Sequence, residues 1–130
     1  MSGNTVNGIA FDTGGTAWIG TGAGLDAFDG TFANYTTADG LPNNNVRDVD
    51  VDGSDTVWAA TANGLGARTS AGSWNSFGTA NGLYSASLRA VLAGEGATAR
   101  VGSDAGYNVY DGSNWTGDFL GNAPLTSNTI

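Results

Sequence analysis

The chain contains no cysteine, no histidine and no lysine, and its single glutamate is Glu95. Without histidine or cysteine, Ser-His-Asp and Cys-His catalysis are excluded, as are zinc sites built from imidazole or thiolate ligands. The four arginines and the net charge of −8 do not provide the clustered cations that bind nucleic acid or an anionic membrane. We therefore expect a non-enzymatic protein with no cofactor, no nucleic-acid partner and no membrane partner. An enzyme that uses aspartate carboxylates is the minor alternative.

Proline is scarce, with 2 residues in 130, whereas glycine is abundant, with 22. Thr, Ser, Asn and Asp fill much of the remainder, and these residue types favour tight turns over helix interiors. No apolar run approaches the roughly 18 residues of a membrane-spanning helix. The composition predicts one all-β domain, covering residues 1–130, with many short strands.

The sequence repeats itself with a period near 40 residues. NTVNGIAFDTGGTAWIGTGAGL from Asn4 aligns with NNVRDVDVDGSDTVWAATANGL from Asn44 and with SASLRAVLAGEGATARVGSDAGY from Ser85. Val6, Val46 and Leu88 correspond in this alignment. A period of this length with several short strands is typical of β-propeller blades. We predict three blades, at residues 4–42, 43–84 and 85–126, each a sheet of four antiparallel strands.

Alternation of apolar residues and turn-forming residues sets the expected strand bounds. The first strands are predicted at 6–12, 46–52 and 88–93, the second at 17–21, 57–61 and 99–103, the third at 25–29, 65–69 and 107–111, and the fourth at 32–36, 74–77 and 115–119. Glycines precede the third strands, where a turn is expected to need a positive φ. The second-to-third-strand turns and the loops between blades are predicted to share one rim.

The stretch DVDVDG at residues 48–53 resembles the opening of a calcium-binding loop. Asp52 aligns with Asp12 of the first unit, but Asp48 and Asp50 align with residues that carry no carboxylate. The intervening valines favour a strand with one apolar face. We interpret Asp12 and Asp52 as acceptors for backbone N–H groups of a turn. We predict no metal site and leave the calcium loop as the alternative.

The first unit resembles a repeat of the two-component regulator propeller family, through NTVNGIAFDTGGTAWIGTGAGL, then FDG and DGLP. The middle unit has Arg68-Thr69-Ser70 in place of the aromatic-Asp-Gly. The third unit has Ala93 in place of the turn aspartate and Arg100 in place of the tryptophan. The resemblance implies propeller blades of a kind common in the periplasmic sensing regions of hybrid histidine kinases. It favours a periplasmic or extracellular location.

The tryptophans of the repeat are predicted to be structural. Trp18 and Trp58 open equivalent strands and are expected to pack between blades. Trp74 and Trp115 open outer strands, where packing at the edge is favoured and stacking on a sugar is the alternative.

Three blades are too few for a closed propeller, which has at least about four. An open row exposes two apolar faces, which soluble monomers rarely tolerate. Ile130 stands in the register of Val6, so the chain stops where a fourth unit would begin. We expect a head-to-tail homodimer that closes a six-bladed ring, with other closed rings and open assemblies as alternatives.

Polar residues gather where each first strand begins, which in a propeller lies near the central channel. The candidate ligand-binding residues are Asn7, Asn43, Asn44, Asn45, Arg47 and Arg89. In a dimeric ring the arginines could bind a carboxylate or sulfate through two hydrogen bonds each, and a saccharide is a second expected ligand. The alternative for these residues is that they are solvated polar residues of surface loops. The alternative for the chain is a purely structural scaffold without its own ligand, either engineered or a natural fragment of a larger propeller.

Overall fold

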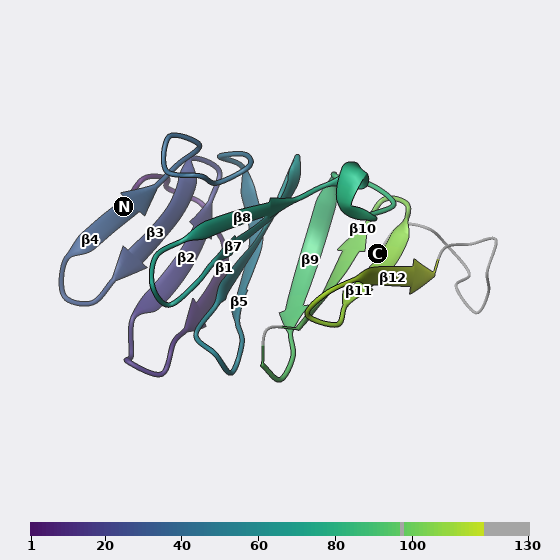
Figure 1. Ribbon diagram of the computed structural model, residues 1–130. Helices are drawn as coiled ribbons and strands as arrows, with labels where there is room; N and C mark the ends of the chain where they lie inside the picture. The colour runs from purple at the N-terminus through teal and green to yellow at the C-terminus, as the bar shows by residue number, and fades with distance from the viewer. Residues whose placement is uncertain (97, 119–130) are drawn as a thin grey trace.

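The computed structural model describes residues 1–96 and 98–118, and this part of the chain is built almost entirely from β-strands. Figure 1 shows three sheets side by side in chain order, with the first and third at opposite ends of the row. Each sheet has four antiparallel strands, and neighbours in the sheet are neighbours in the sequence. The predicted all-β architecture of four-stranded antiparallel units is confirmed.

The strand bounds follow the repeat. The first sheet contains β1 (Val6–Phe11), β2 (Ala17–Thr21), β3 (Gly24–Phe28) and β4 (Phe32–Tyr35). The middle sheet contains β5 (Val46–Val51), β6 (Val57–Thr61), β7 (Gly64–Arg68) and β8 (Trp74–Phe77). The third sheet contains β9 (Leu88–Ala93), β10 (Ala99–Ser103), β11 (Gly106–Tyr110) and β12 (Trp115–Asp118), and a short 3-10 helix, η1 (Thr79–Asn81), precedes it.

The third strand of each sheet begins one residue earlier than predicted, at the glycine itself. Gly24 pairs with Thr21 across a two-residue turn and has φ of +132°. A Cβ added to Gly24 would lie 2.6 Å from the carbonyl oxygen of Tyr35 on the neighbouring strand. The glycine is therefore required both by the turn and by the close approach of β4.

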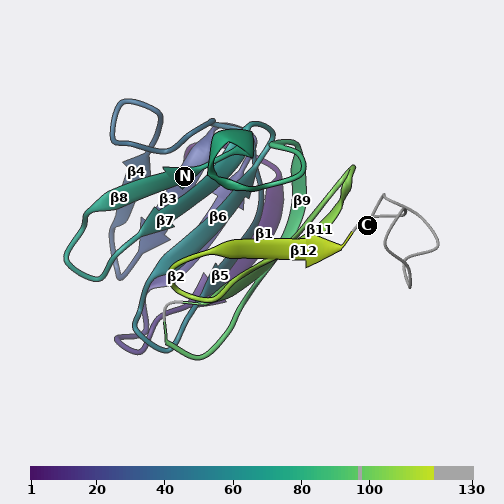
Figure 2. The same ribbon diagram turned by 45° about the vertical axis from the view of Figure 1, so that its right-hand side comes forward.

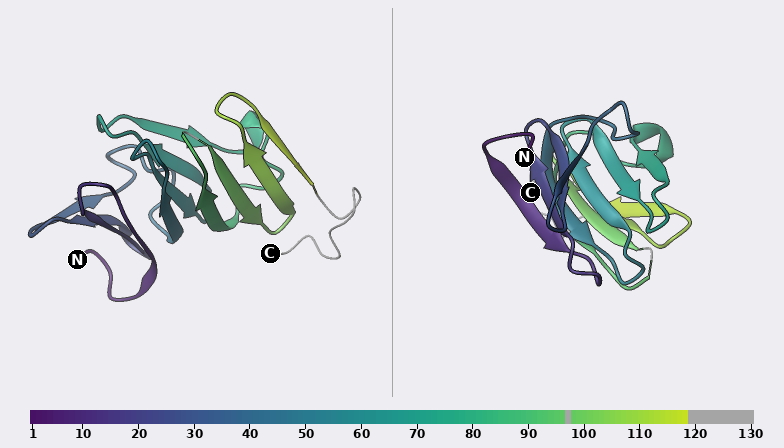
Figure 3. Two further views of the ribbon diagram at one scale, coloured as in Figure 1. Left: turned by 90° about the horizontal axis from the view of Figure 1, so that it is seen from below. Right: turned by 90° about the vertical axis from the view of Figure 1, so that its left-hand side faces the viewer.

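The sheets pack against one another through apolar faces, and β5 lies beside both β1 and β9 (Figures 2 and 3). One core fills the junction between the first and middle sheets, and a second core fills the junction between the middle and third. The first core includes Trp18, Leu25, Leu41, Val46, Val49 and Val57. The second includes Trp58, Leu65, Leu83, Leu88, Val91 and Val101. The middle sheet therefore buries both of its faces, as a propeller blade does.

Glycines let the first two sheets approach closely. A Cβ added to Gly20 would lie 2.7 Å from Cγ1 of Val46 and 2.9 Å from Cγ2 of Val49. A Cβ added to Gly8 would lie 2.9 Å from Oδ1 of Asp48. Branched valine side chains have little freedom to move aside, so the absence of side chains at these glycines sets the spacing between the sheets.

A cluster of four side chains recurs at the outer part of each junction, and we call it the outer cluster. It joins the second-strand tryptophan and a fourth-strand aromatic of one sheet to a third-strand residue and the fourth-strand tryptophan of the next. The members are Trp18, Tyr35, Arg68 and Trp74 at the first junction, and Trp58, Phe77, Tyr110 and Trp115 at the second. The predicted packing of Trp18 and Trp58 between blades is confirmed.

Candidate functional site

The turn aspartates accept hydrogen bonds, as the sequence predicted. Oδ1 of Asp52, a buried carboxylate, accepts from the backbone N–H groups of Ser54 at 2.8 Å and Thr56 at 3.0 Å. Its Oδ2 accepts from the indole N–H of Trp58 at 2.9 Å. Asp12 makes the matching bond to the indole of Trp18 at 3.0 Å. The indole bond was missed, although the constant Asp-to-Trp spacing was the available signal.

The third sheet corrects the expected alignment. The predicted replacement of the turn aspartate by Ala93 is wrong by one residue, because Ala93 lies within β9 and pairs with Ala99. Gly94 occupies the aspartate position, and its N–H donates to the carbonyl of Thr98 just as the N–H of Asp52 donates to that of Thr56. The third sheet therefore lacks both the carboxylate and, at Arg100, the indole that would donate to it.

Asp48 and Asp50 join the middle sheet to the third. Asp48 accepts from the N–H of Val91 at 3.0 Å, and Asp50 accepts from that of Ala93 at 2.7 Å. The second oxygen of each carboxylate accepts from the next residue of its own strand, both at 2.9 Å. Each carboxylate thus accepts from one N–H group of β5 and one of β9, and so bridges the edges of the two sheets. Within the described ranges, no group of three acidic, histidine or cysteine side chains is placed to hold a metal ion.

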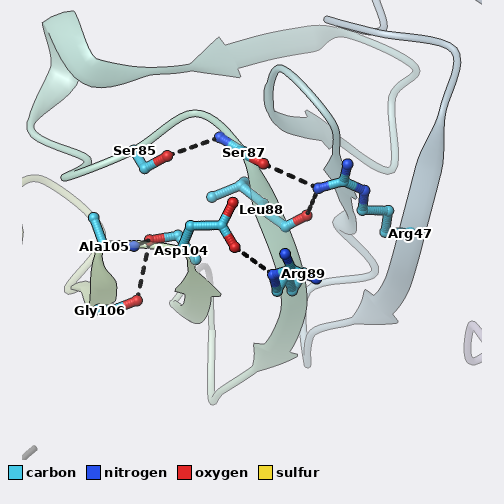
Figure 4. A network of polar contacts seen from close by, with 9 residues as sticks. Arg47, Ser85, Ser87, Leu88, Arg89, Asp104, Ala105 and Gly106 are labelled. Carbon is cyan, nitrogen blue, oxygen red and sulfur yellow. Dashed lines mark hydrogen bonds and ion pairs between the residues drawn. The ribbon is translucent and has the colours of Figure 1, made fainter. Parts of the chain in front are cut away.

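The candidate residues on the first strands form a series that reaches from one sheet to the next. Asn7 donates from Nδ2 to the carbonyl oxygen of Val46 at 2.8 Å. Arg47, at the equivalent position, donates from Nη1 to the carbonyl oxygen of Leu88 at 3.0 Å and to Oγ of Ser87 at 3.1 Å (Figure 4). Both candidates therefore support the junctions between sheets.

Arg89 holds the same position in the third sheet, which has no following sheet among the described residues. Its guanidinium turns to Asp104 and forms an ion pair from Nε to Oδ1 (Figure 4). The two side chains remain 48% and 42% exposed. We call Arg47, Ser87, Arg89 and Asp104 the rim network.

The three asparagines between the first and middle sheets order their own loop. Oδ1 of Asn43 accepts from the N–H of Asn45, and Oδ1 of Asn44 accepts from the N–H of Thr37, both at 2.9 Å. The carbonyl of Asn45 accepts from the N–H of Ala62 in the β6–β7 turn at 3.1 Å. This contact places the turn and the loop at one rim, as predicted. These residues and Asn7 lie at the first junction, whereas Arg47 spans the second and Arg89 pairs within the third sheet.

The rim network contains Arg47 and Arg89, which are two of the four positively charged side chains of this acidic chain. The hydrogen bond from Arg89 lowers the pKa of Asp104 below its ordinary value of 3.8; desolvation opposes this effect, and Ser87 and the charges of Arg89 and Arg47 reinforce it. Asp104 is therefore a carboxylate at neutral pH. The ion pair uses Nε of Arg89, so an anionic ligand at the two terminal nitrogens would share the guanidinium charge with Asp104.

Stability is expected to fall at acid pH through two such carboxylates. The hydroxyl group of Thr13, and after it the backbone N–H of the same residue, lower the pKa of Asp55, as Arg89 lowers that of Asp104. A carboxylate whose pKa is lower in the folded state stabilises the fold at pH values above its unfolded pKa of about 3.9. This stabilisation is lost as the pH falls through the folded pKa. The melting temperature should therefore drop less between pH 5 and pH 2 in the double variant Asp55→Asn, Asp104→Asn than in the wild type. An equal drop would contradict this assignment.

No protein-family model matches the chain, and no curated protein sequence matches it. No helix in the described part is long and apolar enough to cross a membrane. Solved structures do match. The extracellular domain of a hybrid two-component system protein from B. thetaiotaomicron matches 98% of this chain over 18% of its own length, with 21% identity and a TM-score of 0.83.

Two further structures extend the comparison. Virginiamycin B lyase from Staphylococcus aureus has 13% identity and a TM-score of 0.69 over 88% of this chain and 41% of its own. The extracellular domain of a one-component system from B. thetaiotaomicron has 19% identity and a TM-score of 0.53 over 98% of this chain and 23% of its own. This chain spans less than half the length of each. Sensor-system domains and an enzyme share this architecture, so the fold alone does not decide activity. The chain has the β-propeller fold, with three four-stranded blades in the described residues.

Proposed function

We propose that this chain is a non-catalytic β-propeller module that joins a second copy of itself to form a closed ring of six blades. The contrast between internal and terminal blade faces supports this proposal. Val46 and Val49, which face the first blade, are 0% and 4% exposed, whereas the equivalent Val6 and Ile9 on the free face of the first blade are 49% and 55% exposed. Apolar strand residues with this much exposure mark an association surface.

The free face of the third blade offers a complementary surface. Leu92 is 61% exposed there. Beside it lies a mainly apolar hollow of about 180 Å³ whose lining includes Ala90, Leu92, Arg100 and Tyr107. One apolar face and one apolar hollow at opposite ends of a row suit head-to-tail association, which closes when the rotation per blade completes a turn.

The proposed ligand is a small acidic or polyhydroxylated molecule, such as a sugar acid, bound at the channel rim of the ring. The exposure of Arg89 supports it, since a ring would bring together two copies of the rim network. A location outside the cytoplasm is supported by the sensor-system neighbours, which are extracellular domains. In a saccharide thermal-shift screen, a sugar acid should raise the melting temperature of the wild type but not of Arg89→Ala. No shift for any ligand at millimolar concentration would contradict a rim site.

A purely structural scaffold is the second candidate, and specific bonds favour it. Asn7 and Arg47 donate to carbonyl oxygens of the next blade, so two of the six candidate residues already hold the blades together. Absence of any ligand response in that screen would support the scaffold.

Lyase chemistry of the kind found in the structural neighbour receives no support from the residues. That enzyme is described as catalytically inactive when one of its histidines is replaced by alanine. This chain has no histidine at all. Histidine is the usual group for proton transfer near neutral pH, so a module without catalysis is the better supported assignment.

The mass in solution tests the ring. Light scattering on a size-exclusion column, across a dilution series, should give twice the 13.0 kDa mass of one chain, or 26.0 kDa. A mass of one chain at every concentration would overturn the proposed ring. A mass above 26.0 kDa that rises with concentration would indicate an open array rather than a closed dimer, and would overturn it as well.

A further inference from the structure

We infer that the ring-closing junction is held by a cation–aromatic pair, in which Arg100 of one copy lies against Phe28 and Phe32 of the other. The cation then belongs to the preceding blade, whereas at the first internal junction it belongs to the following blade. This inference rests on the proposed ring and names its recognition chemistry. The internal outer clusters provide the template. At the first junction, the guanidinium carbon of Arg68 lies 5.1 Å from the ring centroid of Trp18 and 4.8 Å from that of Tyr35.

The second junction uses the same positions with aromatic groups alone. The ring centroid of Tyr110 lies 5.9 Å from that of Trp58 and 5.2 Å from that of Phe77. Tyr110 also lies 4.9 Å from Trp115, its neighbour across the β11–β12 pair. A third-strand residue of one blade thus packs on the second-strand tryptophan of the preceding blade at both junctions.

Strand register identifies the residues that would meet at the closing junction. Arg100 pairs with Val109 on the third strand, just as Trp58 pairs with Ala67. It therefore holds the tryptophan position of the third blade. Phe28 ends the third strand of the first blade opposite Ala17, just as Arg68 ends its strand opposite Val57. Phe28 therefore holds the position of Arg68 and Tyr110.

Both halves of this cluster are open in the single chain. Phe28 and Phe32 are 39% and 52% exposed, and their ring centroids lie 4.6 Å apart. Arg100 is also exposed, and it makes no hydrogen bond or ion pair with any other described residue. Phe32 opens the fourth strand at the position of Trp74 and Trp115, so the two phenylalanines supply the following blade's half of an outer cluster.

The occupant that fits is a second copy of this chain. An exposed arginine at one end and an exposed aromatic pair at the other are mutually attractive, because a guanidinium binds the face of an aromatic ring. The inner layer agrees: Ile9 and Phe11 would meet the hollow beside Ala90 and Leu92, as Val49 meets Gly8 and Gly20 in the first junction. The closing contact thereby continues the geometry of two observed junctions.

Sedimentation velocity on a dilution series of four proteins tests the pair: wild type, Phe28→Arg, Arg100→Trp, and the double variant. Phe28→Arg places two guanidinium groups together and should raise the dimer dissociation constant at least roughly tenfold. Arg100→Trp recreates an aromatic contact like that of Trp58 and Tyr110 and should leave a dimer. The double variant recreates the Trp18–Arg68 arrangement and should return to within about threefold of the wild-type constant.

Ser70→Arg is the matched control, because it adds the same charge to an exposed turn of the middle blade. It should dimerise like the wild type, and all variants should keep the wild-type circular dichroism spectrum. A wild-type monomer would overturn the proposed ring itself. A wild-type dimer that Phe28→Arg leaves unchanged would overturn only the inferred pair. A dimer lost in Phe28→Arg and not recovered in the double variant would also overturn the pair.

Discussion

Replacing Trp58 with alanine is expected to lower the free energy of unfolding by about 4 kcal/mol, in the usual range for a buried tryptophan. Trp58 is 2% exposed, and its ring centroid lies 6.2 Å from that of Phe77 and 5.9 Å from that of Tyr110. The change leaves a cavity between the middle and third blades and removes the indole that donates to Asp52. Urea unfolding followed by far-UV circular dichroism measures the loss.

Arg100→Ala is the matched control for this experiment, because Arg100 holds the equivalent position on an exposed face. It should change the stability of the dissociated chain by no more than about 0.5 kcal/mol. Both variants should be compared at protein concentrations low enough to keep the chains apart, since association adds apparent stability. If Trp58→Ala does not fold, Trp58→Phe should lose less and still exceed the control. Equal losses at the two positions would contradict the assigned packing.

Replacing Asp52 with alanine is expected to lower the free energy of unfolding by about 3 kcal/mol, because buried donors lose a charged acceptor. The N–H groups of Ser54 and Thr56 and the indole of Trp58 all donate to this carboxylate. Asp52→Asn should lower the free energy of unfolding by less than Asp52→Ala does. The amide oxygen can still accept from the N–H groups of Ser54 and Thr56, but the NH₂ group cannot accept from the indole. Thermal unfolding should show the order wild type, Asp52→Asn, Asp52→Ala.

Asp111→Ala serves as the exposed control for Asp52. Oδ1 of Asp111 accepts from the N–H groups of Ser113 and Asn114, both at 2.8 Å, but this turn is exposed to water. Water can replace a lost acceptor there, so the expected loss is about 1 kcal/mol or less. An Asp111→Ala loss as large as that of Asp52→Ala would mean that burial of the donors is not the source of the effect.

The local features of this fold were predictable from the residues. Each second strand was predicted with its observed bounds, since its β-branched and aromatic residues lie between turn-forming groups. The turn role of Asp52 followed from its place between a strand and a Gly-Ser pair. The replacement of the turn aspartate in the third unit was predicted at Ala93 but lies at Gly94. Without the aspartate, the third unit has no residue that fixes the alignment of its turn with the other two.

The partners of the polar side chains were not predictable in this way. Asp48 and Asp50 were weighed as strand residues or calcium ligands, and their carboxylates accept from N–H groups of a strand more than 40 residues away. Arg47 was placed beside a ligand channel, and its guanidinium donates to the backbone at Leu88. In both cases the side chain serves a group on the next blade, and no spacing within one strand identifies that group. The ligand role of the rim residues remains a prediction.

The sequence by itself determined the repeat, the strand order within each blade and the positions of the turns, because these depend on side-chain period and on backbone preferences over a few residues. The tertiary structure alone decided which faces meet and which polar groups pair between blades. It also separated equivalent positions such as Trp58 and Arg100, which share a register but not an environment. The physical reason is that burial and hydrogen-bond partners across a junction depend on the packing of whole sheets. Within the described residues, the first and third sheets each have a neighbouring sheet on one side, whereas the middle sheet has one on both.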